Sequence, residues 1–250
     1  MAGHSKWHNI RLRKGAQDAR KGKIFTKLAR EIIVAAKEGG GNPEMNGRLR
    51  LAIEKARDAS MPVDNIKRAI QRGTGEGGEA VNYQEMVYEG YAPGGTAVMV
   101  SVLTDNKNRT VADLRSIFSR NGGSLGETGC VAWMFEQKGV ISISTDQVEE
   151  DALLEIALEA GADDVRTEDD TFEVLTSPEN FSQVKDAIVA AGLRPSSAEV
   201  TMLPKSTVSL GGKEAEQVLR LLDMLDDHDD VQQVYANFDI SDRELEAAAA

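Results

Sequence analysis

The chain has 250 residues, of which 41% are apolar and 28% charged, and it carries 29 Lys/Arg against 41 Asp/Glu, a formal net charge of −12. Such a length accommodates two or three compact domains, and the composition is ordinary for a soluble globular protein. The single cysteine, Cys130, excludes an internal disulfide and fits a reducing cytoplasm, and the apolar runs are too short to cross a membrane.

The first thirty residues form a cationic arm with nine Lys/Arg and one acid, Asp18. Residues 1–72 carry 17 basic and 7 acidic side chains, a net of +10, so the other 178 residues carry −22. This asymmetry is typical of a nucleic-acid-facing or membrane-facing segment joined to acidic domains. The arm lacks the apolar stretch of a secretory signal. It continues directly into a helix, which argues against a transit peptide, so we expect a cytoplasmic protein.

Residues 3–23 hold three glycines and few apolar side chains, so this arm is expected to become ordered only on its target. Trp7 is placed either to stack on an exposed base or to anchor the arm to the body of the protein. The cationic residues of the arm predicted to contact nucleic acid are Lys6, Arg11, Arg13, Lys14, Arg20, Lys21 and Lys23.

Three amphipathic helices are predicted after the arm, over residues 24–38, 42–60 and 63–73. Asn42 is the predicted N-cap of the second helix, because proline follows it at the first helical position. The apolar residues of each helix share one face, and the connections are short. Helices of this kind form a small bundle.

The first of these helices presents a cationic side opposite its apolar stripe. Lys27, Arg30 and Lys37 all fall within about 40° of Lys23 on a helical projection. Lysines can serve solubility alone, but solubility would tolerate mixed signs, so we favour contact with phosphates. The other bundle residues predicted at a nucleic-acid interface are Arg48, Arg50, Lys67, Arg68 and Arg72, and Lys55 and Arg57 flank the same apolar stripe as the first two.

The stretch GTGEGGEA at residues 73–80 has the composition of a linker. It also satisfies the dinucleotide pattern G-x-G-x-x-G at Gly73, Gly75 and Gly78. A dinucleotide loop follows a strand and opens a helix, whereas a helix precedes this stretch and a strand follows it. We therefore interpret it as a linker.

Strands and helices are both predicted after the linker. The strands are VNYQEMVYEGY, TAVMVSVLTD, GCVAWMF and VQQVYANFDI, and the helices are NRTVADLRSIFSRNGG and KEAEQVLRLLDMLDD. Lys107 and Arg109 lie at the start of the first of these helices, where backbone N–H groups favour anions. Both are included in the predicted interface, with chance clustering of charge as the alternative.

Residues 137–204 interrupt this order with the pattern β-α-β-β-α-β, the ferredoxin-like arrangement. The segment carries four basic and 15 acidic side chains, a net of −11, so we do not expect it to touch phosphates directly. It is either a solvated acidic module or a domain that contacts another protein.

The predicted fold class is α+β with several domains: an N-terminal three-helix bundle followed by two α+β sheet domains, one of them ferredoxin-like and inserted in the other. The predicted boundaries are residues 1–78 for the basic arm and bundle, residues 79–136 plus 205–240 for the first sheet domain, and residues 137–204 for the inserted acidic domain.

Residues suited to catalysis are scarce. The chain has no G-x-x-x-x-G-K-[ST] loop, no H-E-x-x-H and no paired C-x-x-C. His4 and His8 lie on the basic arm and do not make a zinc site. Cys130 falls in a predicted apolar strand without a basic neighbour, so we expect a buried core thiol rather than a nucleophile. We predict no enzyme activity, catalytic residue, metal, cofactor or small-molecule substrate.

Several blocks of the chain resemble the YebC family: MAGHSKWHNIRLRKGAQDARKGKIFTKLAREI, EGGGNP, MPVDNIKRAIQRGTGE, YEGYAPGG, LTDNKNRT, NGGSLGETG and VYANFDI. The likeness runs from Met1 to about Ile240. The resemblance implies three domains, with the third inserted in the second, and no enzyme activity. Bacterial members are labelled DNA-binding transcriptional regulators. Organellar members, and some bacterial ones, act in translation on the ribosome, including relief of stalling at proline-rich stretches.

The preferred hypothesis is a cytoplasmic factor that uses residues 3–72 to bind RNA on the ribosome, with ribosomal RNA as its main partner and ribosomal proteins as further partners. The alternative is a DNA-binding transcriptional regulator, although no pair of helices shows a clear helix-turn-helix signature. A third class is an acidic adaptor whose basic arm docks onto its own or another acidic domain. We expect no membrane partner.

Overall fold

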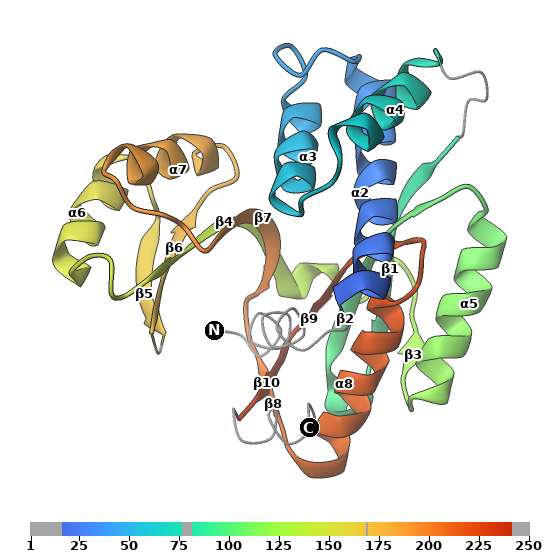
Figure 1. Ribbon diagram of the computed structural model, residues 1–250. Helices are drawn as coiled ribbons and strands as arrows, with labels where there is room; N and C mark the ends of the chain where they lie inside the picture. Colours follow the sequence, from blue (N-terminus) through green and yellow to red (C-terminus); the bar gives the residue numbers. More distant parts are fainter. Residues whose placement is uncertain (1–16, 77–81, 169, 242–250) are drawn as a thin grey trace. The chain divides into compact units, whose positions relative to one another are not determined.

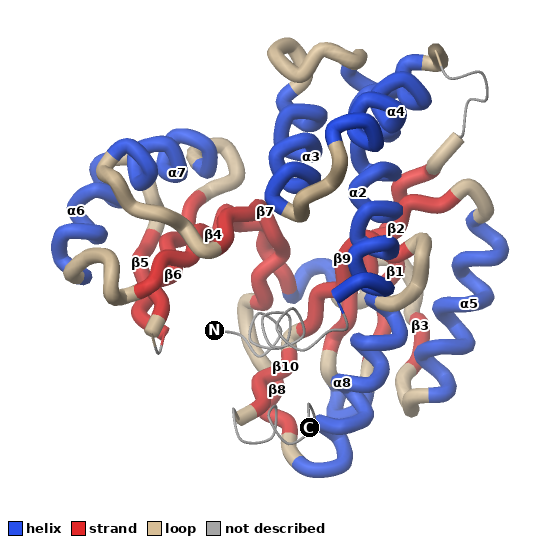
Figure 2. The backbone as a smooth tube through the Cα atoms, in the orientation of Figure 1, coloured by secondary structure: helices blue, strands red, loops and turns tan. Residues whose placement is uncertain are grey.

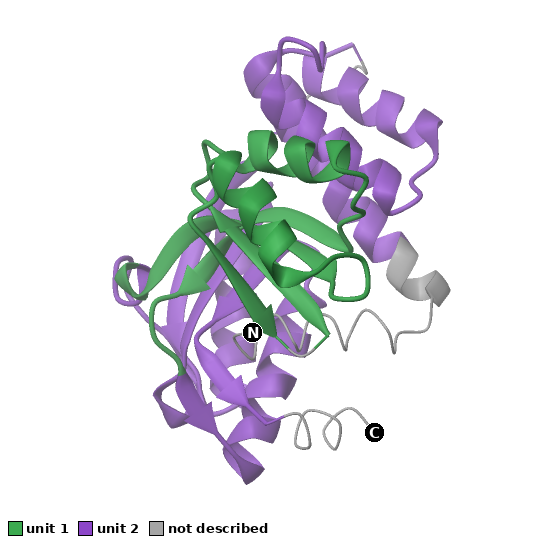
Figure 3. Cartoon of the chain, turned by 90° about the vertical axis from the view of Figure 1, so that its left-hand side faces the viewer, with its two compact units in different colours: residues 1–2, 133–207 green, residues 3–132, 208–250 purple. Residues whose placement is uncertain are grey.

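The computed structural model describes residues 17–76, 82–168 and 170–241, with the backbone alone at residues 17–21. It is an α+β protein, as predicted (Figures 1 and 2). Figure 3 shows two compact units: unit 1 holds residues 133–207, and unit 2 holds the described residues on either side of it. The three-domain boundaries stay a prediction, because the chain divides into two units rather than three.

Unit 2 opens with three helices, α2 (Gln17–Gly39), α3 (Gly47–Asp58) and α4 (Val63–Thr74). Apolar residues recur on each helix at three- and four-residue spacing, so the three stripes bury one another. The shared core contains Ile32, Ala36, Leu49, Ile53, Ala56, Ile66 and Ala69. α2 begins at Gln17, inside the segment that the sequence assigned to the arm. The expectation that residues 3–23 become ordered only on a target is therefore wrong for residues 17–23, whose backbone is helical.

Asn46, rather than Asn42, is the N-cap of α3. Its Oδ1 accepts a hydrogen bond from the backbone N–H of Leu49 at 3.0 Å, and its Nδ2 donates to the carbonyls of Ala35 and Gly40 at 2.8 and 2.9 Å. The buried amide therefore joins the end of α2 to the start of α3. The prediction of a helix start at Asn42 was wrong, because the Asn42 side chain accepts from the N–H of Glu44 in a local turn instead.

α4 ends one residue later than predicted. Gly75 supplies the left-handed C-cap with φ of 83°, a conformation that other residues adopt at a cost. Gly73 lies inside the helix, where a Cβ would be 2.5 Å from the carbonyl oxygen of Ile33 and 2.7 Å from the Cβ of Ala36. The missing side chain of Gly73 thus lets α4 approach the backbone of α2.

The sheet of unit 2 has four antiparallel strands in the order β3-β1-β2-β9. These are β1 (Gln84–Tyr91), β2 (Ala97–Thr104), β3 (Ser124–Leu125) and β9 (Val231–Ala236). Helices α5 (Lys107–Arg120) and α8 (Gly212–Asp226) share a core with it. That core includes Val98, Val100, Leu114, Phe118, Leu221, Leu222 and Val234.

The last predicted strand is two strands in the structure. After β9, the buried Asn237 accepts a hydrogen bond from the N–H of Ala97 on its Oδ1 at 2.7 Å and one from the N–H of Val208 on its carbonyl at 2.8 Å. The chain then continues as β10 (Phe238–Ile240), which pairs in parallel with β8 (Val208–Leu210). The sequence analysis missed β3 and β8, which are too short to show a period.

Unit 1 has the predicted order β-α-β-β-α-β. Its elements are β4 (Phe135–Ser144), α6 (Glu150–Glu159), β5 (Asp164–Glu168), β6 (Thr171–Thr176), α7 (Phe181–Ala190) and β7 (Ser197–Pro204). The strand order is β5-β6-β4-β7, and all neighbours are antiparallel. Unit 1 has its own apolar core, which includes Ile141, Leu153, Phe172 and Ile188.

The segment around Cys130 is a loop followed by a short 3-10 turn (Ala132–Met134), so the prediction of a strand before Phe135 was wrong. The buried carboxylate of Glu89 accepts hydrogen bonds at 2.7 Å from the N–H groups of Gly129, Val131 and Ala132, which a strand would have used for pairing. Burial alone would raise the pKa of Glu89, but these three hydrogen bonds outweigh burial and lower the pKa below its ordinary value.

The Cys130 thiol is half-buried. Burial raises its pKa, and the negative charges of Glu89 and Glu127 raise it further. Because the thiolate is the reactive form, the surroundings of Cys130 disfavour nucleophilic chemistry.

Candidate nucleic-acid interface

The cationic side of α2 contacts an acidic segment of the same unit. Residues 226–230, which end α8 and lead into β9, read DDHDD. Lys27 Nζ lies 3.0 Å from Asp226 Oδ1 and 2.6 Å from the carbonyl oxygen of Asp226. Lys23 Nζ lies 3.8 Å from Asp227 Oδ2 and 3.3 Å from the carbonyl oxygen of Asp227. Two cations that the sequence assigned to phosphates therefore have partners within the chain.

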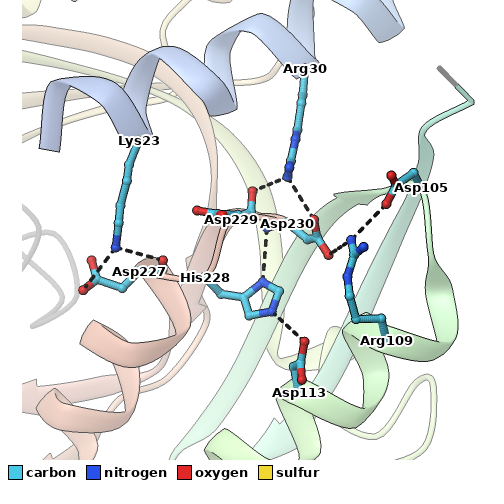
Figure 4. A pocket seen from close by; sticks show the side chains of 9 residues that line it. All are labelled: Lys23, Arg30, Asp105, Arg109, Asp113, Asp227, His228, Asp229 and Asp230. Atoms are coloured by element: carbon cyan, nitrogen blue, oxygen red, sulfur yellow. Dashed lines mark hydrogen bonds and ion pairs between the residues drawn. The ribbon is translucent and has the colours of Figure 1, made fainter. Parts of the chain in front are cut away.

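Among the ion pairs of α2 with this segment, the Arg30–Asp230 pair is the least exposed. Arg30 Nη1 donates to the carbonyl of Asp229 and, at 3.0 Å, to Asp230 Oδ1 (Figure 4). Its guanidinium lies over the Tyr83 ring, 5.4 Å from the ring centre. The Arg30 side chain is 15% exposed and that of Asp230 is 3% exposed. Such a pair resists separation, because either charge would be left buried without a partner.

The carboxylate of Asp230 also binds α5. Its Oδ2 accepts from Arg109 Nη2 at 2.8 Å and from Thr110 Oγ1 at 2.7 Å, and Thr104 Oγ1 lies 3.2 Å away. Desolvation would raise the pKa of Asp230, but the hydrogen bonds from Arg109 and Thr110 and the charges of Arg109 and Arg30 hold it below its ordinary value. Asp230 is therefore an ionised group that joins α2, α5 and β9.

His228 completes the cluster. Its Nδ1 accepts a hydrogen bond from the N–H of Asp230 at 3.1 Å, and its Nε2 lies 3.4 Å from Asp113 Oδ2. These side chains, drawn in Figure 4, line an open hollow of about 600 Å³. Its walls carry both signs of charge. The described part of the chain has no group of three or more His, Cys, Asp or Glu arranged to hold a metal ion. The arrangement is an ion-pair network that connects α2, α5 and the segment before β9.

Other predicted cations of the bundle have local partners. Arg48 lies 2.6 Å from Glu38 Oε2 and 2.7 Å from Glu85 Oε2. Lys37 is exposed and donates a hydrogen bond to Asn82 Oδ1. Arg68 is exposed and donates to the carbonyl of Asp64 and to Asn65 on its own helix. All of these contacts are at the surface, where ion pairs exchange readily with solvent and ligands.

Three of the predicted interface cations of α3 and α4 are exposed without a partner among the described residues. Arg50, Lys67 and Arg72 are exposed, and their side chains make no hydrogen bond or ion pair with another described residue. The same helices carry the apolar faces that build the bundle core, so the cations necessarily point away from it.

Two family profiles match this chain. The profile described as the TACO1/YebC protein N-terminal domain matches residues 5–76, and the profile described as the TACO1/YebC second and third domain matches residues 83–238. The chain belongs to the TACO1/YebC family. The resemblance seen in the sequence is thereby confirmed.

Relatives in this family cover almost the entire chain. A protein of Dictyoglomus turgidum is 59% identical over 248 residues, covering 99% of each chain, and one of Pelotomaculum thermopropionicum is 56% identical over 244 residues, covering 97% of this chain and 100% of the relative. Both are named "probable transcriptional regulatory protein". The crystal structure of a conserved hypothetical protein of Aquifex aeolicus is 48% identical and covers 90% of this chain and 93% of that one, with a TM-score of 0.81.

The predicted site residues of this TACO1/YebC protein thus fall into distinct groups. Lys6, Trp7, Arg11, Arg13 and Lys14 lie outside the described residues, and for Arg20 and Lys21 the structure describes only the helical backbone of α2. At the start of α5, Lys107 is exposed, whereas Arg109 is turned toward Asp105 and Asp230. The structure therefore brings Lys23, Lys27, Arg30 and Arg109 to aspartates and leaves Arg50, Lys67, Arg72 and Lys107 open.

The acidic partner of α2 was missed by the sequence analysis. The run DDHDD is visible in the sequence, but nothing local indicates that it meets a helix about 200 residues earlier. The buried acids Glu89 and Asp230 were missed as well, since each is one of 41 acids.

Within the described residues, no helix has both the length and the apolar character that a membrane span requires.

Proposed function

We propose that this protein is a non-enzymatic, nucleic-acid-binding regulator of gene expression whose preferred target is RNA on the ribosome. The observation that carries the proposal is the segregation of charge. Residues 1–72 have a net charge of +10, whereas residues 133–207, which form unit 1, have 16 acidic and five basic side chains, a net of −11. A polyanion is attracted to the first segment and repelled by the second. The names of the relatives support a regulatory role in general.

The proposed interface combines the arm with the exposed side of the bundle. Arg50, Lys67 and Arg72 are free to meet phosphates, and the cations of residues 3–23 extend the charged surface along the chain. Each phosphate that a cation neutralises releases counterions, so binding strength depends on how many cations engage together. Arg68, next to Lys67 in the sequence, and Lys107, at the start of α5, are also exposed and belong to the same proposal.

RNA is preferred because of the composition of the arm. A segment rich in Gly, Lys and Arg with few apolar residues suits the irregular surface of folded RNA, on which such segments become ordered. The acidic unit 1 would stay off the phosphates and serve positioning or contact with ribosomal proteins.

A DNA-binding transcriptional regulator is the second candidate, and one observation favours it. α3 and α4 are joined by only four residues, 59–62, and α4 exposes Lys67, Arg68, Gln71 and Arg72. Arg and Gln are side chains that read base edges in the major groove, and a short connection between two helices is a feature of the helix-turn-helix. The adaptor candidate draws on the contact of α2 with residues 226–230 of its own chain.

The first test is co-sedimentation of the protein with ribosomes through a density gradient. The intact chain is compared with a variant in which Arg11, Arg13 and Lys14 are changed to Gln. Co-migration that depends on these three residues supports the ribosomal proposal. Retention of a discrete promoter fragment against excess competitor DNA, without ribosome binding, supports the transcriptional candidate. Binding to neither leaves the adaptor.

The second test concerns the bundle. The triple variant Arg50→Gln, Lys67→Gln, Arg72→Gln should bind single-stranded RNA more weakly, and the slope of log affinity against log salt should become shallower by about 2, because three contacts of about 0.7 each are lost. Fluorescence anisotropy with a labelled oligonucleotide at several salt concentrations measures both quantities. The control, Arg194→Gln, Lys213→Gln, Arg220→Gln, removes three exposed cations outside the bundle. Equal losses in the two variants would contradict the proposed interface.

A further inference from the structure

Four aspartates lie within five residues at the end of α8: Asp226, Asp227, Asp229 and Asp230. The C-terminal carbonyls of the helix add partial negative charge at the same place. Lys23 and Lys27 each contact both a side-chain oxygen and a carbonyl oxygen of this segment. Like a phosphate backbone, the segment thus offers the cations of α2 a row of carboxylate and carbonyl oxygens at 2.6 to 3.8 Å.

The three contacts differ in how firmly they are held. The Lys23 and Asp227 side chains are 47% and 55% exposed, and those of Lys27 and Asp226 are 15% and 28% exposed. Arg30 pairs with Asp230, which is also held by Arg109, Thr110 and Thr104. The exposed Lys23–Asp227 pair is of low net stability and exchanges partners easily. The Lys27–Asp226 pair is partly buried but has one carboxylate contact, whereas the buried Asp230 is held by several donors and does not exchange.

We propose that residues 226–230 act as an internal competitor of nucleic acid: they occupy Lys23 and Lys27, and a bound polyanion takes over these two cations while Arg30 stays on Asp230 as a fixed pivot. This inference rests on the proposed function. Its consequence is that, in the protein without bound nucleic acid, two cations of the interface are paired with aspartates and are not available to phosphates. A ligand that engages only a few phosphates does not displace the segment, whereas a longer polyanion does.

The decisive variant is Asp226→Asn, Asp227→Asn, which removes two carboxylates and keeps the carbonyl contacts, the Asp230 network and the size of the side chains. Single-stranded RNA of about 20 nucleotides serves as the probe. We expect binding at low salt to become about tenfold tighter, and the salt slope to become steeper by about 1.4, because two cations are released at about 0.7 each. The matched control, Glu155→Gln, Glu159→Gln, removes two exposed acids of unit 1 and should change affinity less than about twofold.

A second pair of variants identifies the released cations. Lys23→Gln, Lys27→Gln should have little effect on RNA affinity in the otherwise unchanged protein and should abolish the gain when combined with Asp226→Asn, Asp227→Asn. The single variant Asp227→Asn, at the more exposed position, is expected to steepen the slope by about 0.7 and guards against misfolding of the double variant. Thermal unfolding checks that each variant folds.

The outcomes separate the inference from the function on which it rests. If Arg50→Gln, Lys67→Gln, Arg72→Gln weakens binding but the aspartate variant gains no more than its unit 1 control, the internal competitor is refuted and the proposed function stands. If the unchanged protein binds neither RNA nor duplex DNA, the internal competitor and the proposed nucleic-acid-binding function are both refuted. If Lys23→Gln, Lys27→Gln alone removes most of the affinity, these lysines are already available and the inference is again overturned.

Discussion

Asp230 joins three elements through one carboxylate, which contacts Arg30 of α2 and both Arg109 and Thr110 of α5 from the start of β9. Burial would raise the pKa of this carboxyl, but the hydrogen bonds from Arg109 and Thr110 and the nearby arginine charges lower it and favour the ionised form. Removing the Asp230 side chain would leave Arg30, whose side chain is only 15% exposed, without its carboxylate partner. The stability of unit 2 should therefore depend on the protonation of Asp230.

The folded-state pKa of Asp230 is lowered, so its contribution to stability is fully present above the unfolded value of about 3.9 and is lost as the pH falls through the folded value. Asp230→Asn should lower the free energy of unfolding by on the order of 3 kcal/mol at neutral pH, and this difference should shrink on acidification below the unfolded value. Denaturant unfolding of both proteins at a series of pH values measures it. Parallel pH profiles would show that Asp230 is not the group responsible.

At the scale of elements, the packing of α4 on α2 depends on the absence of a side chain at Gly73. Helices whose backbones approach closely need a small residue at the crossing, because a Cβ would meet main-chain atoms that cannot move away. Ile33 supplies the carbonyl oxygen at this crossing. The approach also sets where the exposed face of α4, with Lys67 and Arg72, is presented.

Gly73→Ala should lower the free energy of unfolding by about 2 kcal/mol, although alanine is the better helix former, because the helices must separate. The control is Gly47→Ala at the first residue of α3, where a Cβ would have only Arg50 nearby, at 3.8 Å. There the substitution should leave stability unchanged or raise it by up to about 1 kcal/mol. Equal effects at the two glycines would mean that α2 and α4 adjust freely to one another.

At the scale of the whole molecule, positive charge is concentrated in the first 72 residues and negative charge in the rest. Unit 1 adds a net charge of −11 within a single segment of the chain, residues 133–207. Its first and last strands are neighbours, since Glu136 of β4 pairs with Leu203 of β7. The first and last strands of unit 1 therefore lie side by side.

Replacing residues 137–202 by Asn-Gly should leave unit 2 folded, because the dipeptide forms a two-residue hairpin turn between the paired residues Glu136 and Leu203. A single cooperative thermal transition is the expected result. RNA affinity at low salt should be kept or increased, because the variant lacks a net charge of −11. An unfolded or aggregated variant would show instead that unit 2 needs unit 1 to complete its core.

The sequence by itself determined the helices of the bundle, the order of elements in unit 1 and the polarity of charge along the chain. Each of these depends on residues close together in the chain: apolar spacing, glycine and proline at boundaries, and a count of charged side chains. Short strands such as β3 and β8 carry no such period, and the segment at Cys130 is shaped by a distant carboxylate, Glu89. The two short strands and the loop at Cys130 could therefore not be predicted from the local sequence pattern.

Only the tertiary structure decided which cations are available. Lys27 and Arg50 look alike in the sequence, yet Lys27 is held by Asp226, 199 residues away, and Arg50 points to solvent. The physical reason is that periodicity records which side of a helix faces a core, while the charge that a side chain presents depends on whatever the fold brings opposite it. The folded chain alone supplies that partner. Three cations of α2 meet aspartates of residues 226–230, whereas Arg50, Lys67 and Arg72 on α3 and α4 stay open to solvent.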